Sequence, residues 1–320
     1  TNVVFSNNHC KADGGAVASG THSQMIFEEC HFENNWSEST CGAIGVAGKD
    51  KKNLSDATFT KVHFVGNHCS IDGGAMVVGR YSRAKFDQCL FERNYVEEKT
   101  GGAVLILGRE SGFVTIADFN GVIFRENHCR IDGGAINANI YSQVSFKNCL
   151  FEKNIAKEKN GGAIVLLGKD GNCQTKAIFH NVVFRQNQCK VSGGAINAND
   201  YTRSHFVECT FEENRAIKKN GGAILVLGED GRYPSEAKFV KVKFRRNYCL
   251  GSGGAVNANV FTISHFEACL LEKNVAEENG GGILIRGLRR MPNKAVITGC
   301  HFLGNIAGNI GADVALNAVK

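Results

Sequence analysis

The chain has 320 residues, of which 21% are charged and 43% hydrophobic, and its formal net charge is +6. This composition is typical of a soluble, folded chain, and a charge so mild and so evenly spread argues against nucleic acid as a partner. No apolar run approaches the ~18 residues of a transmembrane helix, so we expect no membrane span in this chain. Thirty-eight glycines and two prolines indicate glycine and asparagine turns between uninterrupted backbone ladders.

Two short motifs recur along the chain from Phe5 onward. Phe-x-x-Asn occurs in ten copies, and Leu271 replaces the phenylalanine in an eleventh. Gly-Gly-Ala, or a remnant of it, follows each copy within seven residues of its asparagine. The spacing between copies alternates between 27 and 31–33 residues, so the full period is a pair of unequal turns of about sixty residues in total.

Short runs rich in valine, isoleucine and phenylalanine lie between the motifs, as in AILVL at Ala223 to Leu227. They are too short and too β-branched for helices, and glycines bound them. Strands of this kind, joined by tight turns at a fixed period, predict a solenoid of parallel strands. We therefore expect residues 1–320 to form a single all-β domain, a parallel β-helix of about eleven turns.

A second phenylalanine column supports the solenoid. Nine phenylalanines, such as Phe146, each lie five residues before a motif Phe or Leu. Stacked turns are ~4.8 Å apart, so like residues at like positions form continuous interior rows. We expect both phenylalanine columns in the core, and the motif asparagines, such as Asn154, in an inward ladder of side-chain amide hydrogen bonds. The paired glycines suit a positive φ or a close backbone approach.

The residue after the motif aromatic alternates in charge over seven consecutive turns. The series is Glu92, Arg125, Glu152, Arg185, Glu212, Arg245 and Glu272. Identical charges ~4.8 Å apart would repel along the whole face, whereas alternation predicts a ladder of ion pairs. Because a slip of one turn would bring like charges together, we expect the ladder to fix the register of the turns.

The coupled Gly-Gly-Ala-(Ile/Val) and Phe-x-x-Asn motifs resemble the repeats of the polymorphic outer membrane proteins, best known from chlamydial surface autotransporters. The resemblance extends from Phe5 to Ala312. It implies a right-handed parallel β-helix at a cell surface, associated with the outer membrane in a bacterium, with adhesion as the usual role. The partner would then be a protein or glycan on the surface of a host or neighbouring cell.

Ten of the thirteen cysteines form two regular sets, whose members are twenty residues apart. The pairs are Cys10 and Cys30, Cys69 and Cys89, Cys129 and Cys149, Cys189 and Cys209, and Cys249 and Cys269. One interpretation is a disulfide in each sixty-residue unit, formed in an oxidising compartment. The other is two columns of buried free thiols that alternate with alanine or valine. The Cys-x-x-Cys spacing of zinc sites is missing, so we expect no metal.

Parallel β-helices also include polysaccharide lyases and glycoside hydrolases, whose sites need clustered carboxylates. The candidate column here is Asp13, Asp72 and Asp132, which recurs every second turn, or about 10 Å, and so favours turn capping. His9, His68 and His128 form a similar column and are too far apart to share a metal. No nucleophile elbow, phosphate loop or zinc helix motif occurs, so we expect no catalytic residue and no cofactor.

The longer turn of each pair carries an inserted loop, and we expect these loops to stack along one edge. Their variable tips are candidate binding positions: Asn53, Phe113, Cys173 and Tyr233. A second candidate is a line of aromatic residues, which either packs at the turns or contacts sugars or proteins: Tyr81, Tyr141, Tyr201 and Phe261.

Together these features predict a non-enzymatic, extracellular or cell-surface β-helix that acts in adhesion or in structural and filament assembly. A polysaccharide-degrading β-helix enzyme is the alternative. The strand pattern runs from Thr1 almost to Lys320, and unpaired strand edges at the ends of a solenoid favour end-to-end self-association. We therefore also expect the chain to be part of a filament or a longer surface stalk.

Overall fold

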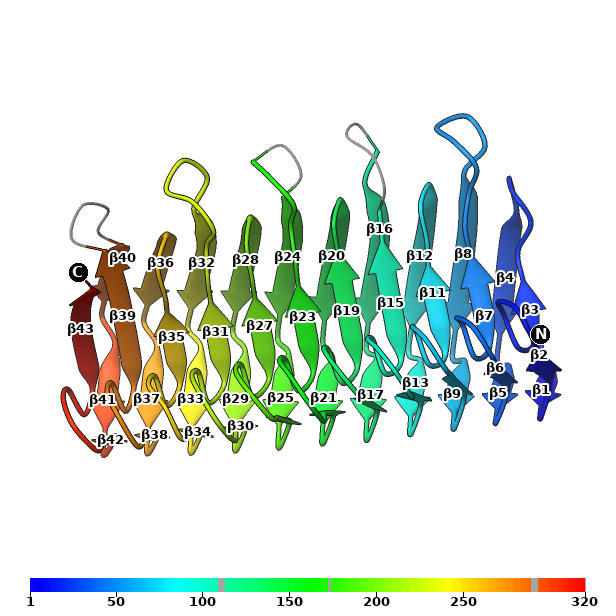
Figure 1. The fold of residues 1–320 in the computed structure, drawn as a ribbon. Coiled ribbons are helices and arrows are strands. Elements are labelled where there is room, and N and C mark those ends of the chain that lie inside the picture. The colour runs from blue at the N-terminus through cyan, green and yellow to red at the C-terminus, as the bar shows by residue number, and fades with distance from the viewer. Residues whose placement is uncertain (109–112, 172–173, 289–292, 320) are drawn as a thin grey trace.

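The computed structural model describes residues 1–108, 113–171, 174–288 and 293–319. The described residues form 43 short strands and no helix, and the strands stack in register as four parallel sheets that wind around one axis (Figure 1). Three sheets have eleven strands and the fourth has ten, which confirms the predicted all-β parallel solenoid of about eleven turns. No helix that could span a membrane occurs in the described part of the chain.

Each turn of the solenoid passes through the sheets in the order A, B, C, D. Sheet A holds the Phe-x-x-Asn strands: β1 (Val4–Ser6), β5 (His31–Glu33), β9 (His63–Val65), β13 (Leu90–Glu92), β17 (Ile123–Arg125), β21 (Leu150–Glu152), β25 (Val183–Arg185), β29 (Thr210–Glu212), β33 (Lys243–Arg245), β37 (Leu270–Glu272) and β41 (His301–Leu303). Sheet B holds two-residue strands: β2 (His9–Cys10), β6 (Trp36–Ser37), β10 (His68–Cys69), β14 (Tyr95–Val96), β18 (His128–Cys129), β22 (Ile155–Ala156), β26 (Gln188–Cys189), β30 (Arg215–Ala216), β34 (Tyr248–Cys249), β38 (Val275–Ala276) and β42 (Ile306–Ala307).

Sheet C follows the Gly-Gly-Ala turns: β3 (Val17–Ala18), β7 (Ile44–Val46), β11 (Met76–Val78), β15 (Val104–Leu107), β19 (Ile136–Asn139), β23 (Ile164–Leu166), β27 (Ile196–Ala198), β31 (Ile224–Val226), β35 (Val256–Ala258), β39 (Ile283–Leu288) and β43 (Val314–Val319). Sheet D holds longer strands: β4 (Gln24–Glu28), β8 (Ser55–Thr60), β12 (Ser82–Asp87), β16 (Thr115–Asn120), β20 (Ser142–Lys147), β24 (Thr175–His180), β28 (Thr202–Val207), β32 (Ser235–Val240), β36 (Thr262–Glu267) and β40 (Lys294–Thr298).

The two phenylalanine columns meet inside the solenoid, as predicted. Phe151 of sheet A is fully buried and stacks on Phe124 of the preceding turn, with ring centroids 4.6 Å apart. Phe146 of sheet D meets Phe151 edge to face at 5.4 Å. Each ring thus packs against others along the axis and across the core, and burying one phenylalanine stabilises the fold by roughly 1.5–3 kcal/mol.

The motif asparagines form the predicted inward ladder. Asn154 is fully buried, and its backbone N–H and its Nδ2 both donate to Oδ1 of Asn187 at 3.0 Å. Its own Oδ1 accepts the same two bonds from Asn127, and its Nδ2 also donates to the carbonyl oxygen of Phe124 at 2.9 Å. The ladder therefore satisfies the buried polar groups of the A-to-B corner from one turn to the next.

The glycine motif marks the place where neighbouring turns approach most closely. A Cβ atom on Gly134 would lie 2.1 Å from the carbonyl oxygen of Gly162 and 2.6 Å from the backbone nitrogen of Ile155. Gly133, the first glycine of the same motif, has a φ of +73°, in the left-handed region. Gly134 is thus required by the close approach of the next turn, and Gly133 adopts a φ that glycine reaches without strain, which supports their interpretation as determinants of the fold.

The alternating charges form ion pairs between turns on the outer face of sheet A. Arg125 bridges Glu92 at 3.3 Å and Glu152 at 3.2 Å, and Nε of Arg185 donates to Glu152 at 2.9 Å. Glu272 pairs with Arg245 at 3.2 Å. The predicted ion-pair ladder is therefore confirmed over these turns.

Candidate functional site

The inserted loops project from one edge of the solenoid on alternate turns, between sheets C and D (Figure 1). Their described tips are half-buried, and each contacts its own loop, a neighbouring loop or the base of the loops. Nδ2 of Asn53 donates to Asp50 at 3.0 Å, and the ring of Phe113 lies 5.4 Å from that of Tyr81. The ring of Tyr233 covers Gly171 of the preceding loop. Cys173, the remaining predicted tip, lies outside the described residues.

The predicted aromatic line forms the packed base of these loops. Tyr81 and Tyr201 are only 7% and 6% exposed, and Tyr141 and Phe261 are half-buried. All four have a φ of 54° or 55°, and their backbone lies directly beneath the first glycine of a loop. Oη of Tyr201 donates to Oδ2 of Asp230 in the next loop at 2.7 Å. The line therefore anchors the loops and leaves little surface for a ligand, in keeping with turn packing.

The described cysteines are free thiols, and the two members of each of four twenty-residue pairs lie in different places. Cys129 belongs to a small second core beneath sheet B, where Cys69, Cys189 and Cys249 alternate with alanine or valine. Cys149 belongs to the main core, and its Sγ donates to the carbonyl oxygen of Lys147 at 3.3 Å. The structure thus contains two columns of small thiols and not the disulfides. Burial raises the pKa of the Cys149 thiol to about 12 and that of Cys209 to about 11.

The aspartate column caps turns. Oδ1 of Asp72 accepts hydrogen bonds from the backbone N–H of Thr100 at 3.0 Å and from its hydroxyl at 2.7 Å. Oδ1 of Asp132 accepts the corresponding bond from Asn160 at 2.8 Å. Burial raises the pKa of both carboxyls. Among the described residues, no group of three or more potential metal ligands comes together.

The histidine column is part of a larger stack that the sequence did not predict. Trp36 and Tyr95 fill the gaps between His9, His68 and His128 on the outer face of sheet B. Successive ring centroids are 3.9, 5.6, 4.5 and 5.2 Å apart, and the planes are within 9° of parallel. Neighbouring rings occupy most of the ring faces, so the stack offers mainly ring edges to a ligand. Burial lowers the pKa of His68 and of His128.

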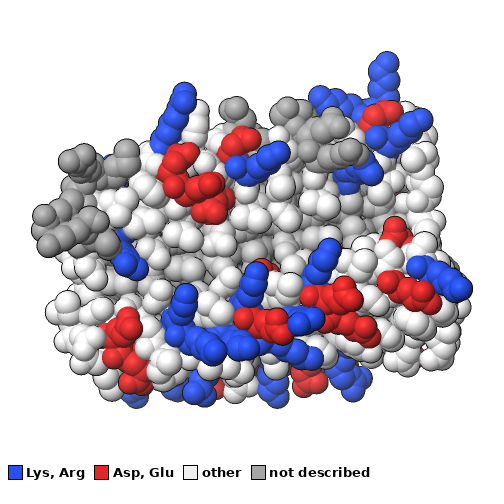
Figure 2. Space-filling view, in the orientation of Figure 1, with Lys and Arg blue, Asp and Glu red and all other residues white. Residues whose placement is uncertain are grey.

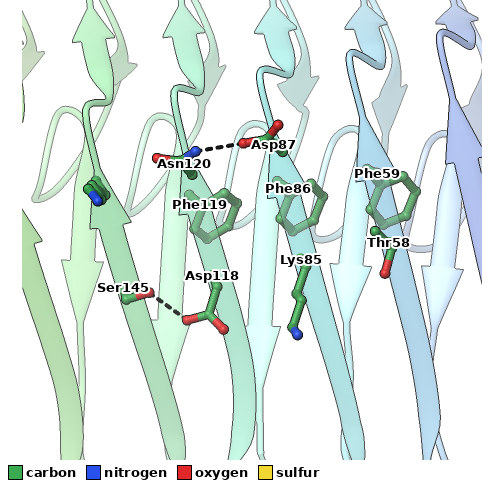
Figure 3. A pocket seen from close by; sticks show the side chains of 10 residues that line it. Thr58, Phe59, Lys85, Phe86, Asp87, Asp118, Phe119, Asn120 and Ser145 are labelled. Atoms are coloured by element: carbon green, nitrogen blue, oxygen red, sulfur yellow. Dashed lines mark hydrogen bonds between the residues drawn. The ribbon is translucent and has the colours of Figure 1, made fainter.

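The outer face of sheet D carries two hollows that the sequence also did not predict. Alternation in the long strands buries alanine and phenylalanine on one face and places mostly polar side chains on the other. The first hollow has a volume of about 380 Å³ and is charge-balanced (Figure 3). Its charged residues are Lys85, Asp87, Asp118 and Lys147. Asn120 donates to Asp87 at 2.6 Å, and Ser145 donates to Asp118 at 2.5 Å.

The second hollow lies farther along the same face, over β24, β28, β32 and β36, and has a volume of about 520 Å³. Its outward-facing residues are Lys176, Ile178, Arg203, His205, Glu236, Lys238 and His265. Three cations and two histidines thus surround one carboxylate. Figure 2 shows the molecule in the orientation of Figure 1, where mixed charge follows the lower edge and few charges cover the strands of sheet C. The second hollow on sheet D therefore carries an excess of positive charge.

Comparison with known proteins agrees with the motifs. The model of the Chlamydia polymorphic membrane protein repeat matches residues 2–20, 181–199 and 208–226, and each match spans one Phe-x-x-Asn and the Gly-Gly-Ala after it. The chain is also 30% identical over 166 residues to the "Probable outer membrane protein PmpG" of Chlamydia muridarum (strain MoPn / Nigg). That match covers 47% of this chain and 16% of the relative. The chain therefore carries Chlamydia polymorphic membrane protein repeats and is a distant homologue of PmpG.

Proposed function

We propose that this chain is a non-enzymatic scaffold displayed at the outer surface of a bacterial cell, where it acts in adhesion. Its partner is a protein or glycan on the surface of a host or neighbouring cell. The observation that carries the proposal is the contrast between an invariant interior and varied outer columns. The asparagine ladder and the phenylalanine stacks keep one cross-section from turn to turn, while outward positions of sheet D change identity at almost every strand.

Similarity to a protein named as an outer membrane protein supports the surface location. A rigid solenoid suits display because its side chains are held at fixed intervals of ~4.8 Å along a straight surface. A ligand that runs parallel to the axis can therefore contact several turns at once, and such contacts reinforce one another when the ligand is repetitive.

The test has two parts. Antibodies to the folded chain should label intact, unpermeabilised cells of the source organism, and beads coated with the 320-residue chain should adhere to cultured animal cells above beads coated with albumin. Coated beads that adhere no better than the albumin control would contradict adhesion, and labelling only after permeabilisation would contradict surface display.

The enzymatic alternative is tested separately. Asp87 and Asp118 lie on neighbouring strands and are the two carboxylates of the first hollow, so they are the residues to test for polysaccharide cleavage. We expect no release of reducing or unsaturated ends from acidic or neutral polysaccharides. Release that is lost in Asp118→Asn would instead establish a β-helix enzyme.

A further inference from the structure

The second hollow on sheet D has the composition of an anion-binding site. Strand register places Lys176 beside Arg203 and Ile178 beside His205, and the next strand adds Lys238 to the histidine column. The same column ends at His265 on β36. Neighbouring strands are ~4.8 Å apart, so these nitrogen-bearing side chains converge over four turns on one patch.

Charge pairing within the hollow leaves an excess of positive charge. Arg203 and Glu236 form an ion pair at 3.3 Å, with side chains that are 49% and 42% exposed. No described residue forms an ion pair with Lys176 or Lys238. Since both ammonium groups face the same hollow, the local field attracts anions, and it is not cancelled by carboxylates as in the first hollow.

His205 adds an unmet hydrogen-bonding group. Its Nε2 is shielded from solvent and has no hydrogen-bond partner among the described residues. A shielded polar atom without a partner costs free energy, so a ligand group that supplies the bond is favoured.

We propose that this basic hollow binds a segment of acidic glycan, whose sulfate or carboxylate groups pair with Lys176, Arg203 and Lys238. The inference rests on the proposed adhesive function and names the ligand class. The residues that line the hollow come from four successive strands, which suits a linear chain that runs along the axis. Ile178, whose exposed fraction is 48%, supplies an apolar contact for the carbon-bonded face of a sugar ring.

The lining favours a glycan over a nucleic acid. Binding of single-stranded nucleic acid combines a basic groove with aromatic side chains on which bases stack. No phenylalanine, tyrosine or tryptophan is among the residues that line the described hollow. A positively charged surface without aromatic side chains suits a polymer that carries its anionic groups on saturated sugar rings.

Binding should be linked to proton uptake. In the free protein, burial and the charge of Lys238 lower the pKa of His205, and the groups around it are Lys176, Arg203, Glu236 and His265. An anion bound between these side chains favours the imidazolium form and raises that pKa again. Affinity should therefore increase as the pH falls through the histidine range, from about 8 to about 5.5.

The first experiment measures binding of a heparin-derived hexasaccharide to the full chain by calorimetry, with a neutral dextran hexasaccharide and inorganic sulfate as comparison ligands. We expect heparin binding that weakens at least about fivefold between 50 and 200 mM salt, and no dextran binding. Lys176→Glu/Lys238→Glu should weaken it at least tenfold. Lys85→Glu/Lys147→Glu makes the same charge change in the first hollow and is the matched control, with little effect expected.

The second experiment repeats the titration at pH 5.5 and pH 8. The wild-type chain should bind more tightly at pH 5.5, and His205→Gln should lose most of that difference while circular dichroism stays unchanged. Equal losses in both lysine pairs, sulfate binding as tight as heparin binding, or preference for single-stranded DNA over heparin would overturn the proposal.

Bead adhesion with the same variants separates this inference from the proposed function. Beads coated with Lys176→Glu/Lys238→Glu that adhere as well as wild-type beads would overturn the glycan site and leave adhesion standing. If wild-type beads do not adhere although heparin binds at the hollow, adhesion fails and the site stands.

Discussion

The sulfur of Cys41 lies 3.2 Å from the position that a Cβ atom on Gly45 would occupy. In the next turn the arrangement is exchanged, because Gly73 takes the place of the cysteine and Val77 pairs in register with Gly45. There the Cγ2 of Val77 lies 2.7 Å from the position of a Cβ on Gly73. One side chain, and not two, fits between the glycine turn and sheet C. The Cys-Gly-Ala turn therefore combines a cysteine in the motif with a glycine on the strand of sheet C, whereas the next turn combines a glycine in the motif with a valine on the strand.

This relationship predicts strong coupling between the two positions. Gly45→Val alone should destabilise the fold by about 2 kcal/mol, because the new side chain meets the cysteine sulfur in a packed site. Cys41→Gly alone should also destabilise it, because a small cavity remains. The double variant reproduces the neighbouring turn and should recover about 1–3 kcal/mol relative to the sum of the single changes. Urea unfolding of the four proteins measures this coupling, and additive effects would contradict the exchange.

Removal of a ladder amide should be among the most destabilising single changes. Asn154→Leu leaves the backbone N–H and Nδ2 of Asn127 without their acceptor in a buried site. We expect a loss of roughly 2–5 kcal/mol, since each buried group left unpaired costs about 1–3 kcal/mol. Thermal unfolding measures the loss.

The matched control for the ladder is Asn120→Leu. Asn120 is an exposed asparagine on the outer face of β16, with a side-chain bond to Asp87. Its replacement should change stability by no more than about 0.5 kcal/mol. Equal effects of the two substitutions would show that Asn154 does not act through burial.

The sequence predicted the features that repeat one residue type at one position. Stacking of equivalent positions in successive turns is enough to predict the contacts of Phe151, Asn154 and Glu152, because each of these residues meets its counterparts in the two adjacent turns. The ring stack on sheet B was not predicted, because Trp36 and Tyr95 occupy the same position as the histidines of the neighbouring turns but are different residue types. The hollows were missed for a different reason. They depend on which outward-facing side chains the strands of sheet D bring together, and the identities of these side chains follow no period in the sequence.

The ion-pair ladder should make stability depend on pH through Glu152. Partial burial opposes the charged carboxylate, but the hydrogen bonds and charges of Arg185 and Arg125 outweigh it and lower the pKa of Glu152. A carboxyl with a lowered folded-state pKa adds stability above its unfolded pKa, near 4.3, and loses it as the pH falls through the folded value. The stability difference between wild type and Glu152→Gln should be about 1 kcal/mol at pH 7 and should shrink as the pH falls below about 4. A difference that does not change with pH would contradict this role.

The thiol columns predict a clear pattern of reactivity. Thiolates are the reactive species, so Cys149, with its raised pKa and full burial in the core, should resist iodoacetamide at pH 8 in the native protein. Among the described cysteines, Cys10 and Cys300 are the two that are only half-buried, and they should react before the others. Under denaturing, non-reducing conditions all thirteen cysteines should become alkylated. Mass spectrometry that finds a Cys129–Cys149 cross-linked peptide in unreduced protein would restore the disulfide hypothesis.

The second glycine of the Gly-Gly-Ala motif offers the sharpest test of how the turns stack. Gly134→Ala places a methyl group 2.1 Å from the Gly162 carbonyl oxygen, and both contacting segments are backbone, so neither can yield without separating two turns. We expect a loss of more than about 3 kcal/mol, or failure to fold, because overpacking against fixed atoms breaks the hydrogen bonds of a whole turn. Gly20→Ala is the control, since its nearest neighbour would be Oγ of Ser23 at 3.8 Å and the residue is exposed. It should leave the melting temperature within about 2 °C of wild type. A Gly134→Ala protein as stable as the Gly20→Ala protein would mean that the turns are not held at this spacing, and the parallel stacking of sheet C would have to be revised.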